Sequence, residues 1–183
     1  MIQEKFDFYR PCKLLQPYVR YYWILEDGAD VSVSERTLPT GCIQLVFHRG
    51  KRLLLVGKKE SQPQAFICGQ CLNFSDVMSA GKIEMITVVF QPYAARAILQ
   101  LPLKFFYGEL IAVDAIEDLE LSILSRKVIE ADDHETCIRL IEQFLIHRLY
   151  RFEGYEYNLK RISAVLHQIN EQAKTNISEL SET

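Results

Sequence analysis

The sequence predicts an α+β fold in which an antiparallel β-sandwich or small β-barrel is followed by an α-helical region. Between residues 15 and 91, apolar residues alternate or form short runs bounded by turn residues, which is the pattern of β-strands. After Pro92 the apolar spacing changes to that of amphipathic helices. Six or seven short strands in one half of a chain are typical of an antiparallel sandwich or barrel.

The predicted strands alternate with turn signals. The first covers residues 18–25 and ends at the turn 26–30. Its alternate residues are expected to share one face: Val19, Tyr21, Trp23 and Leu25. The further strands are expected at 32–38, 42–48, 53–56, 65–69, 73–78 and 83–90. The Gly-containing connection between 42–48 and 53–56 predicts that these two strands form a hairpin with a longer loop.

Helices are expected after the strands. The first covers 93–101 and ends before Pro102, and the second covers 118–131. The third begins at a capping box formed by Asp132 and Glu135 and runs to about residue 150. A linker at 151–158 precedes a fourth helix at 159–173.

Residues 176–183 have the pattern of one more helix start, with Asn176 as the N-cap. The sequence stops within that first turn, so we expect a fragment whose next segment is missing. The expected organisation is a β-rich domain with its helices at 1–150, followed at 151–183 by a linker and the first helices of a truncated domain.

Composition limits the class of protein. The chain has no apolar run near the roughly 20 residues of a membrane span and no signal-peptide pattern, so we expect a cytoplasmic protein that does not enter membranes. Its five cysteines are an odd number and fit reduced thiols better than disulfides. The net charge of −3 argues against a domain that grips a phosphate backbone by itself.

Few motifs carry chemistry. Cys68 and Cys71 have the CxxC spacing of zinc sites and redox dithiols, but zinc needs two further ligands and no second pair has matching spacing. The basic stretch 48–52 reads as a solvated loop. We find no nucleophile with its base and no Gly-rich phosphate loop. The sequence therefore predicts a protein that is not an enzyme and that needs no metal or cofactor.

Aromatic residues on several predicted strands suggest a small-molecule pocket at the mouth of the β domain. The candidate lining residues are Tyr21, Trp23, Phe47, Phe66 and Phe90. A plain aromatic core explains the same residues, and the two interpretations stay open.

An apolar stripe on the third helix, formed by Ile138, Ile141 and Leu145, is a candidate dimer surface. Packing of that stripe against the sheet is the alternative interpretation.

Several segments together resemble a known family. They are PYVRYYW at 17–23, RTLPTG at 36–41, QLVF at 44–47, VFQP at 89–92 and LQLP at 99–102, with a glycine at 81. In this order they resemble the N-terminal domain of a subgroup of AraC-type (AraC/XylS family) bacterial transcriptional regulators over residues 11–150. The chain departs from the family pattern at Ala94, where glycine is common, and at Thr40, where aspartate is usual.

The resemblance implies a regulatory and dimerisation domain with a cupin-like β fold, followed by two helix-turn-helix units that read DNA. It implies a homodimer, a possible small-molecule effector, and DNA as a partner through the missing C-terminal part. No DNA-contacting residue is expected within these 183 residues, because the recognition helices would follow them. The family has no fixed effector site, so the resemblance assigns no ligand residue.

Two other function classes stay open. One is an autonomous cupin-like binding module without a DNA role. The other, which is less favoured, is a metal-dependent cupin enzyme. Such an enzyme needs several His or carboxylate ligands on neighbouring strands, whereas His48 is the only histidine in the β half.

Overall fold

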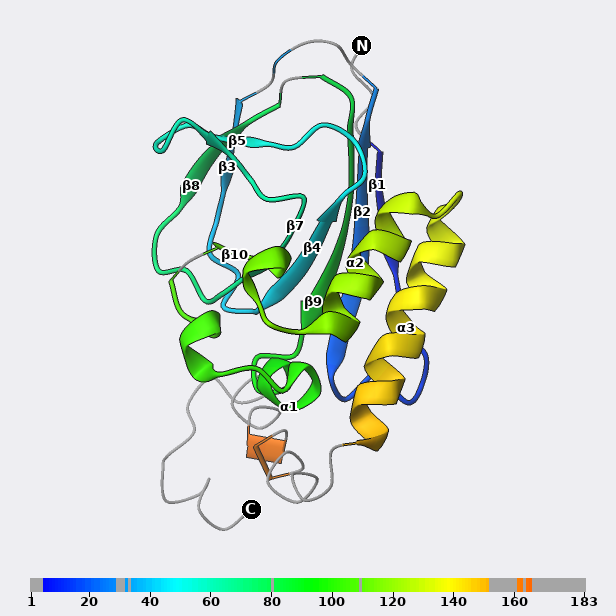
Figure 1. Cartoon of the computed structure of the whole chain (residues 1–183). Helices are drawn as coiled ribbons and strands as arrows, with labels where there is room; N and C mark the ends of the chain where they lie inside the picture. Colours follow the sequence, from blue (N-terminus) through cyan, green and yellow to red (C-terminus); the bar gives the residue numbers. More distant parts are fainter. Residues whose placement is uncertain are drawn as a thin grey trace.

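Two antiparallel sheets and a layer of helices make up the protein in the computed structural model (Figure 1), which describes residues 5–28, 32, 34–79, 81–108, 110–151, 161, 162, 164 and 165. Strands come first along the chain and the longer helices follow, so the predicted α+β class is confirmed. The expected fourth helix falls mainly outside the described residues, and the expected helix start at 176–183 falls entirely outside them.

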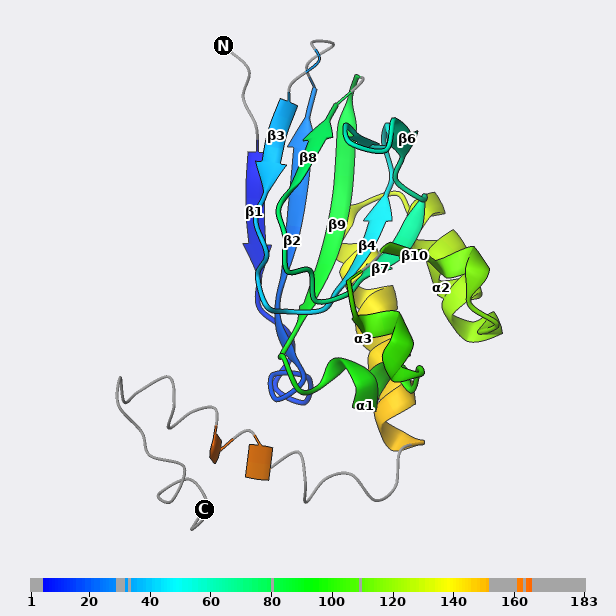
Figure 2. The ribbon, with the colours of Figure 1, turned by 90° about the vertical axis from the view of Figure 1, so that its left-hand side faces the viewer.

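The larger sheet has six strands in the order β1-β2-β9-β4-β7-β10. Figure 2 shows the central strands succeeding one another across the sheet. Their bounds are β1 Lys5–Tyr9, β2 Val19–Asp27, β4 Gln44–His48, β7 Ala65–Cys68, β9 Ile83–Phe90 and β10 Leu110–Ala112. The edge strands β1 and β10 were not expected from the sequence.

The smaller sheet has four short strands in the order β3-β8-β5-β6. They are β3 Ser34–Thr37, β8 Ser75–Met78, β5 Leu54–Leu55 and β6 Glu60–Ser61. In Figure 1 β3, β5 and β8 lie at the left, on the side of the larger sheet away from α2 and α3. One core therefore lies between the two sheets, and a second core lies between the larger sheet and the helices.

The predicted hairpin between 42–48 and 53–56 is wrong, because β4 and β5 belong to different sheets. After β4 the chain continues beside β9: Arg49 N and Gly50 N donate to Glu84 O at 2.7 and 3.0 Å. A Cβ atom at position 50 would lie 2.6 Å from Glu84 N, so only glycine permits this close approach. The glycine that suggested a hairpin loop instead lets the chain cross from one sheet to the other.

A β-bulge divides the expected common face of β2. The register of β2 against β9 shifts between Val19 and Tyr21. As a result Val19 packs in the helix-side core, whereas Trp23 and Leu25 face the smaller sheet.

The helices occur close to the predicted positions. They are α1 Ala95–Leu99, α2 Leu119–Glu130 and α3 His134–Tyr150, with two 3₁₀ turns at Leu103–Phe106 and Val113–Ala115. Asp118, which the sequence placed inside the second helix, is instead its N-cap and accepts from Leu121 N. Asp133 rather than Asp132 caps α3, because its carboxylate accepts both the backbone N–H and the hydroxyl of Thr136.

The stripe proposed as a dimer surface lies in the helix-side core. Ile141 and Leu145 have no exposed surface, and Ile138 is partly buried against the same cluster. Ile141 and Leu145 therefore cannot serve as an exposed interface. The alternative interpretation, in which α3 packs on the sheet, accounts for the burial of both residues.

Candidate functional site: a cavity between the two sheets

A cavity of about 430 Å³ lies between the larger and the smaller sheet. Small-molecule sites in proteins have volumes of about 300–1,000 Å³, so it has the size of a ligand pocket. Its lining is mainly apolar, with Trp23 and Phe66 from the larger sheet and Phe74 from the loop before β8. A second pocket, lined by Leu25, Val77 and Ile83 among others, has only about 30 Å³.

One row of paired residues forms the floor of the cavity. Trp23 pairs with Thr87, Thr87 with Val46, and Val46 with Phe66, so the row crosses β2, β9, β4 and β7. Directly paired residues project from the same face of a sheet. All four line the cavity. The register of the central strands thus places two aromatic rings on either side of a hydroxyl and a small apolar side chain.

Thr87 is an unusual member of this row. It has no exposed surface, and its Oγ1 has no hydrogen-bond partner among the described residues. Buried hydroxyl groups are normally hydrogen-bonded, and one left without a partner is costly. Its Oγ1 has almost no surface that a water molecule in the cavity could contact, so the hydroxyl is sealed beneath the cavity floor and is not presented to a ligand.

Amide side chains add further hydrogen-bonding groups. Gln44 and Gln62 both line the cavity. Gln62 Oε1 lies 2.9 Å from Nε2 of the buried His48. Burial lowers the pKa of His48 below its ordinary value, so the ring is neutral at pH 7 and donates this hydrogen bond.

The mouth of the cavity carries an ordered ion pair. Arg36 on β3 donates two hydrogen bonds to Asp76 on β8, at 2.8 and 3.2 Å, which lowers the pKa of Asp76. The Arg36 guanidinium also stacks 3.8 Å from the centre of the Phe74 ring. Leu38 and Phe74 line the cavity and are exposed, at 70% and 53%, so apolar surface lies beside the ion pair at its entrance.

Three thiols are among the residues that line the cavity. Cys68 and Cys71 form the CxxC pair, with their Sγ atoms 4.0 Å apart, and Cys42 precedes the neighbouring strand β4. All five cysteines lie in the described part of the chain and are free thiols. Burial, together with Cys71, raises the pKa of Cys68 to about 12, so this thiol is protonated at pH 7.

The structure separates the five aromatic residues predicted to line a pocket. Trp23 and Phe66 line the cavity, whereas Phe47 and Phe90 are fully buried in the core on the helix side. Phe47 and Phe90 each follow a residue whose side chain lies on the cavity face of the sheet. Because side chains alternate between the two faces along a strand, both rings point away from the cavity. Tyr21 packs edge-on against Phe8 of β1, 5.6 Å between ring centres, and is not among the lining residues.

Sequence reasoning missed Thr87 and Cys42. The signal for Thr87 was a polar residue within the apolar stretch of 85–90. No sequence signal indicated Cys42, because its place in the cavity lining depends on how β4 pairs with its neighbours.

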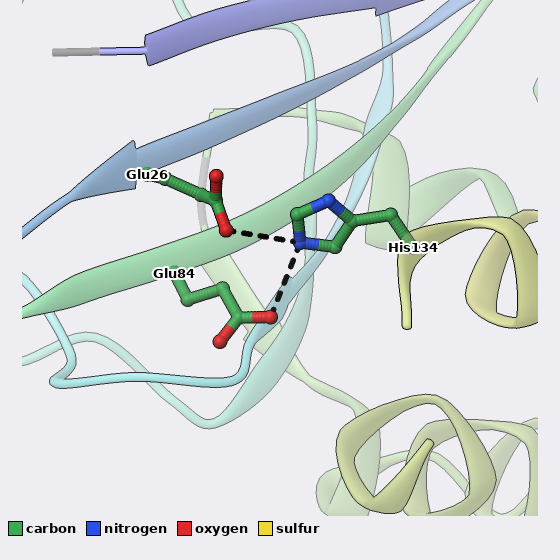
Figure 3. A group of neighbouring side chains, drawn as sticks. All are labelled: Glu26, Glu84 and His134. Carbon is green, nitrogen blue, oxygen red and sulfur yellow. Dashed lines mark hydrogen bonds and ion pairs between the residues drawn. The ribbon is translucent and has the colours of Figure 1, made fainter. Parts of the chain in front are cut away.

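A second group of polar residues lies on the opposite side of the larger sheet. His134 at the start of α3 faces Glu26 of β2 and Glu84 of β9 (Figure 3), with its Nε2 3.4 and 3.3 Å from their Oε1 atoms. Arg49 Nε lies 3.0 Å from the same oxygen of Glu84 and already supplies a positive charge there. We assign this group a structural role, which is to join α3 to the sheet.

Comparison with known proteins assigns the β domain to a protein family. No curated protein matches the chain. Residues 7–112, more than half of the chain, match the family described as domain of unknown function DUF6597. This span contains every residue that lines the cavity. The chain is therefore a member of the DUF6597 family.

Proposed function

We propose that the chain is the effector-binding regulatory part of an AraC-type DNA-binding transcriptional regulator. The observation that carries the proposal is the cavity between the sheets, in which a mainly aromatic and apolar lining is combined with the side-chain amides of Gln44 and Gln62. Pockets that bind small molecules combine such a lining with a few placed polar groups. The order of sequence segments that resembles AraC-type regulators supports the wider role.

The chemistry of the cavity favours binding over catalysis. Among the described lining residues there is no histidine to act as a general base beside a serine or cysteine. The Cys68 thiol, with a pKa of about 12, is a poor nucleophile at pH 7. His48 is buried behind Gln62 and is not among the lining residues. The groups that remain can orient a ligand but do not form an acid–base or nucleophilic centre.

DNA recognition is assigned to the part of the regulator that would follow these residues. The net charge of −3 is poorly suited to neutralising a phosphate backbone. Ligand binding in the β domain would then bias how the DNA-reading part engages its operator. Self-association, which the resemblance also implies, would use a surface other than Ile141 and Leu145, because both are in the core.

The ligand-binding role can be tested with the only tryptophan of the chain, Trp23, because it lines the cavity. A library of small metabolites is screened by thermal shift, and each hit is titrated while Trp23 fluorescence is recorded. A ligand at 100 times its dissociation constant should add about 2.7 kcal/mol to the free energy of unfolding. Stabilisation together with a saturable change in Trp23 emission supports the proposal; a broad library without either contradicts it.

The regulatory role needs a second measurement on the complete gene product. Its affinity for promoter DNA is compared with and without the identified ligand. A ligand-dependent change in affinity supports the AraC-type assignment. Ligand binding without any specific DNA binding would instead identify an autonomous binding module.

A further inference from the structure

Two parts of the cavity differ in burial. Gln62, Phe66 and Met85 line one part and are each at most 8% exposed. Leu38 and Phe74, which are both exposed, line the part at the mouth. Polar groups in the buried part therefore have few water partners, and they restrict which ligand the cavity can hold.

Gln62 is held in one orientation by the buried His48. Its backbone N–H donates to Leu53 O at 2.7 Å, and its Oε1 lies 2.9 Å from His48 Nε2 on the larger sheet. His48 Nδ1 has no partner among the described residues, and buried N–H groups are rarely left without one. The neutral ring therefore carries its proton on Nε2 and donates it to Gln62 Oε1. The amide nitrogen of Gln62 is thus directed away from His48.

The Gln62 amide nitrogen is an unused hydrogen-bond donor. Gln62 Nε2 makes no hydrogen bond to any described residue, and it is not sealed from solvent although the residue is only 8% exposed. Because Gln62 lines the cavity, an acceptor atom reaches this nitrogen from the cavity. The buried part therefore selects a ligand with an acceptor oxygen.

The charges around the cavity favour an uncharged acceptor. Only Lys58 and Asp76 are charged among the described lining residues. Asp76 is paired with Arg36, and Lys58 lies in the exposed turn before β6. The side chains beside Gln62 in the buried part are uncharged. A carboxylate there would lose its hydration without a cation in contact, whereas a carbonyl oxygen loses much less.

Gln44 presents the opposite polarity to the cavity. Its Nε2 donates to Thr40 Oγ1 at 3.2 Å, and the backbone N–H of Cys42 donates to the same hydroxyl at 3.3 Å. Gln44 Oε1 has no partner among the described residues, and this half-buried side chain lines the cavity. The oxygen is free to accept from a donor on the ligand, such as a hydroxyl group.

The two amides are separated by the length of one strand. Gln44 and His48 are the first and last residues of β4, about 13 Å apart at about 3.3 Å per residue. Val46 lies between them in the row of paired residues that runs from Trp23 to Phe66. A ring with a short chain would cover this apolar row and carry one polar group toward each amide.

We propose that the effector of this cavity is an uncharged molecule with an apolar, ring-containing body, a carbonyl oxygen that accepts from Gln62 and a hydroxyl group that donates to Gln44. This ligand class rests on the proposed function, because it concerns the same cavity. Gln62 is then a specificity-determining residue, and His48 is a positioning residue that holds its amide.

The ligand class is tested with a series of phenols joined to a methyl ketone through methylene chains of increasing length. Each ketone is compared with three analogues: the alkylphenol without the carbonyl, the methyl ether without the free hydroxyl, and the carboxylate in place of the ketone. Binding to the 183-residue chain is measured by thermal shift and by titration of Trp23 fluorescence. We expect the best phenolic ketone to bind about 5- to 100-fold more tightly than its alkylphenol, and more tightly than the ether and the carboxylate.

Variants assign each preference to one amide. Gln62→Glu keeps an oxygen for His48 but replaces the amide nitrogen with an acceptor, so it should erase the preference for the ketone over the alkylphenol; Gln62→Met serves if this variant does not fold. Gln44→Met should erase the preference for the free phenol over its methyl ether. Gln16→Glu is the matched control, because Gln16 is exposed and lies outside the cavity, and it should leave both preferences unchanged. Each preference is a ratio of affinities within one variant, so a moderate loss of stability does not alter it.

Four results would overturn the proposal. They are equal affinity for ketone and alkylphenol, tighter binding of the carboxylate, an intact ketone preference in Gln62→Glu, and no binding by any member of the series. The metabolite screen with Trp23 tests the proposed function separately. A stabilising metabolite without a carbonyl group that shifts Trp23 emission would keep the cavity as an effector site while contradicting this ligand class.

Discussion

Replacing Thr87 with valine should make the ligand-free protein more stable. Thr87 has no exposed surface and its hydroxyl has no partner among the described residues. An unsatisfied buried polar group costs about 1–3 kcal/mol, and valine has nearly the same shape as threonine without the hydroxyl. We therefore expect a gain of about 1 kcal/mol in the free energy of unfolding, which raises Tm by about 2–4 °C in a chain of this length.

The assay is urea and thermal unfolding followed by circular dichroism. Fluorescence is avoided because Trp23 lies beside the substituted residue and its emission would respond to the substitution itself. Thr37→Val is the matched control. The Thr37 hydroxyl donates to Ser75 O at 2.9 Å, so its removal should lower stability by up to about 1 kcal/mol.

The same Thr87→Val substitution should leave ligand affinity nearly unchanged, because the hydroxyl has no surface open to the cavity. A gain in stability with little change in affinity is the predicted combination. A loss of more than about 1 kcal/mol of stability in Thr87→Val would refute the reasoning, because it would show that the hydroxyl is hydrogen-bonded in the ligand-free protein.

Three further substitutions test the fold. Gly50→Ala places a Cβ atom 2.6 Å from a backbone atom and should lower the free energy of unfolding in urea by about 1–3 kcal/mol. The control Gly57→Ala, whose Cβ would have no described atom within 4 Å, should change it little. Equal effects of the two substitutions would contradict the close crossing at Gly50. Ile141→Ala should lower the free energy of unfolding by about 2–5 kcal/mol, whereas Leu119→Ala, at a 76% exposed position, should be nearly neutral. A stable, monomeric Ile141→Ala variant would contradict core packing and favour a role of Ile141 in a dimer interface. Because burial lowers the pKa of His48, the unfolded chain binds a proton that the folded chain does not, so stability should fall as the pH drops below about 6.5. Unfolding measured between about pH 7.5 and 5.5 should show a smaller decline in His48→Gln; an unchanged decline would assign it to other groups.

Local patterns predicted most of the elements but not their partners. Strand and helix periods located β2, β4, β7, β9, α2 and α3, because each buries a face with the corresponding spacing. The pairing of β4 failed, since a glycine in a short connection indicates a hairpin as readily as a crossing. The decisive fact, the contact of Gly50 with the backbone of β9, is non-local.

The site was predictable only in part for a related reason. The central strands are buried on both faces, so alternation divides their residues into two sets without saying which set faces the cavity. Trp23 and Phe66 belong to the cavity set, whereas Phe47 belongs to the helix set. The position of Cys42 in the cavity lining depends on strand register, which sequence periodicity does not determine.

That the cavity between the sheets holds a small molecule is tested most directly by the NMR signals of methionine methyl groups. Met85 lines the cavity and Met78, on β8, does not. In protein labelled at methionine methyl carbons, a ligand identified by thermal shift should move the Met85 resonance and leave that of Met78 in place. A stabilising ligand that leaves Met85 unmoved would show that it binds elsewhere and would contradict the assignment of the cavity as the effector site.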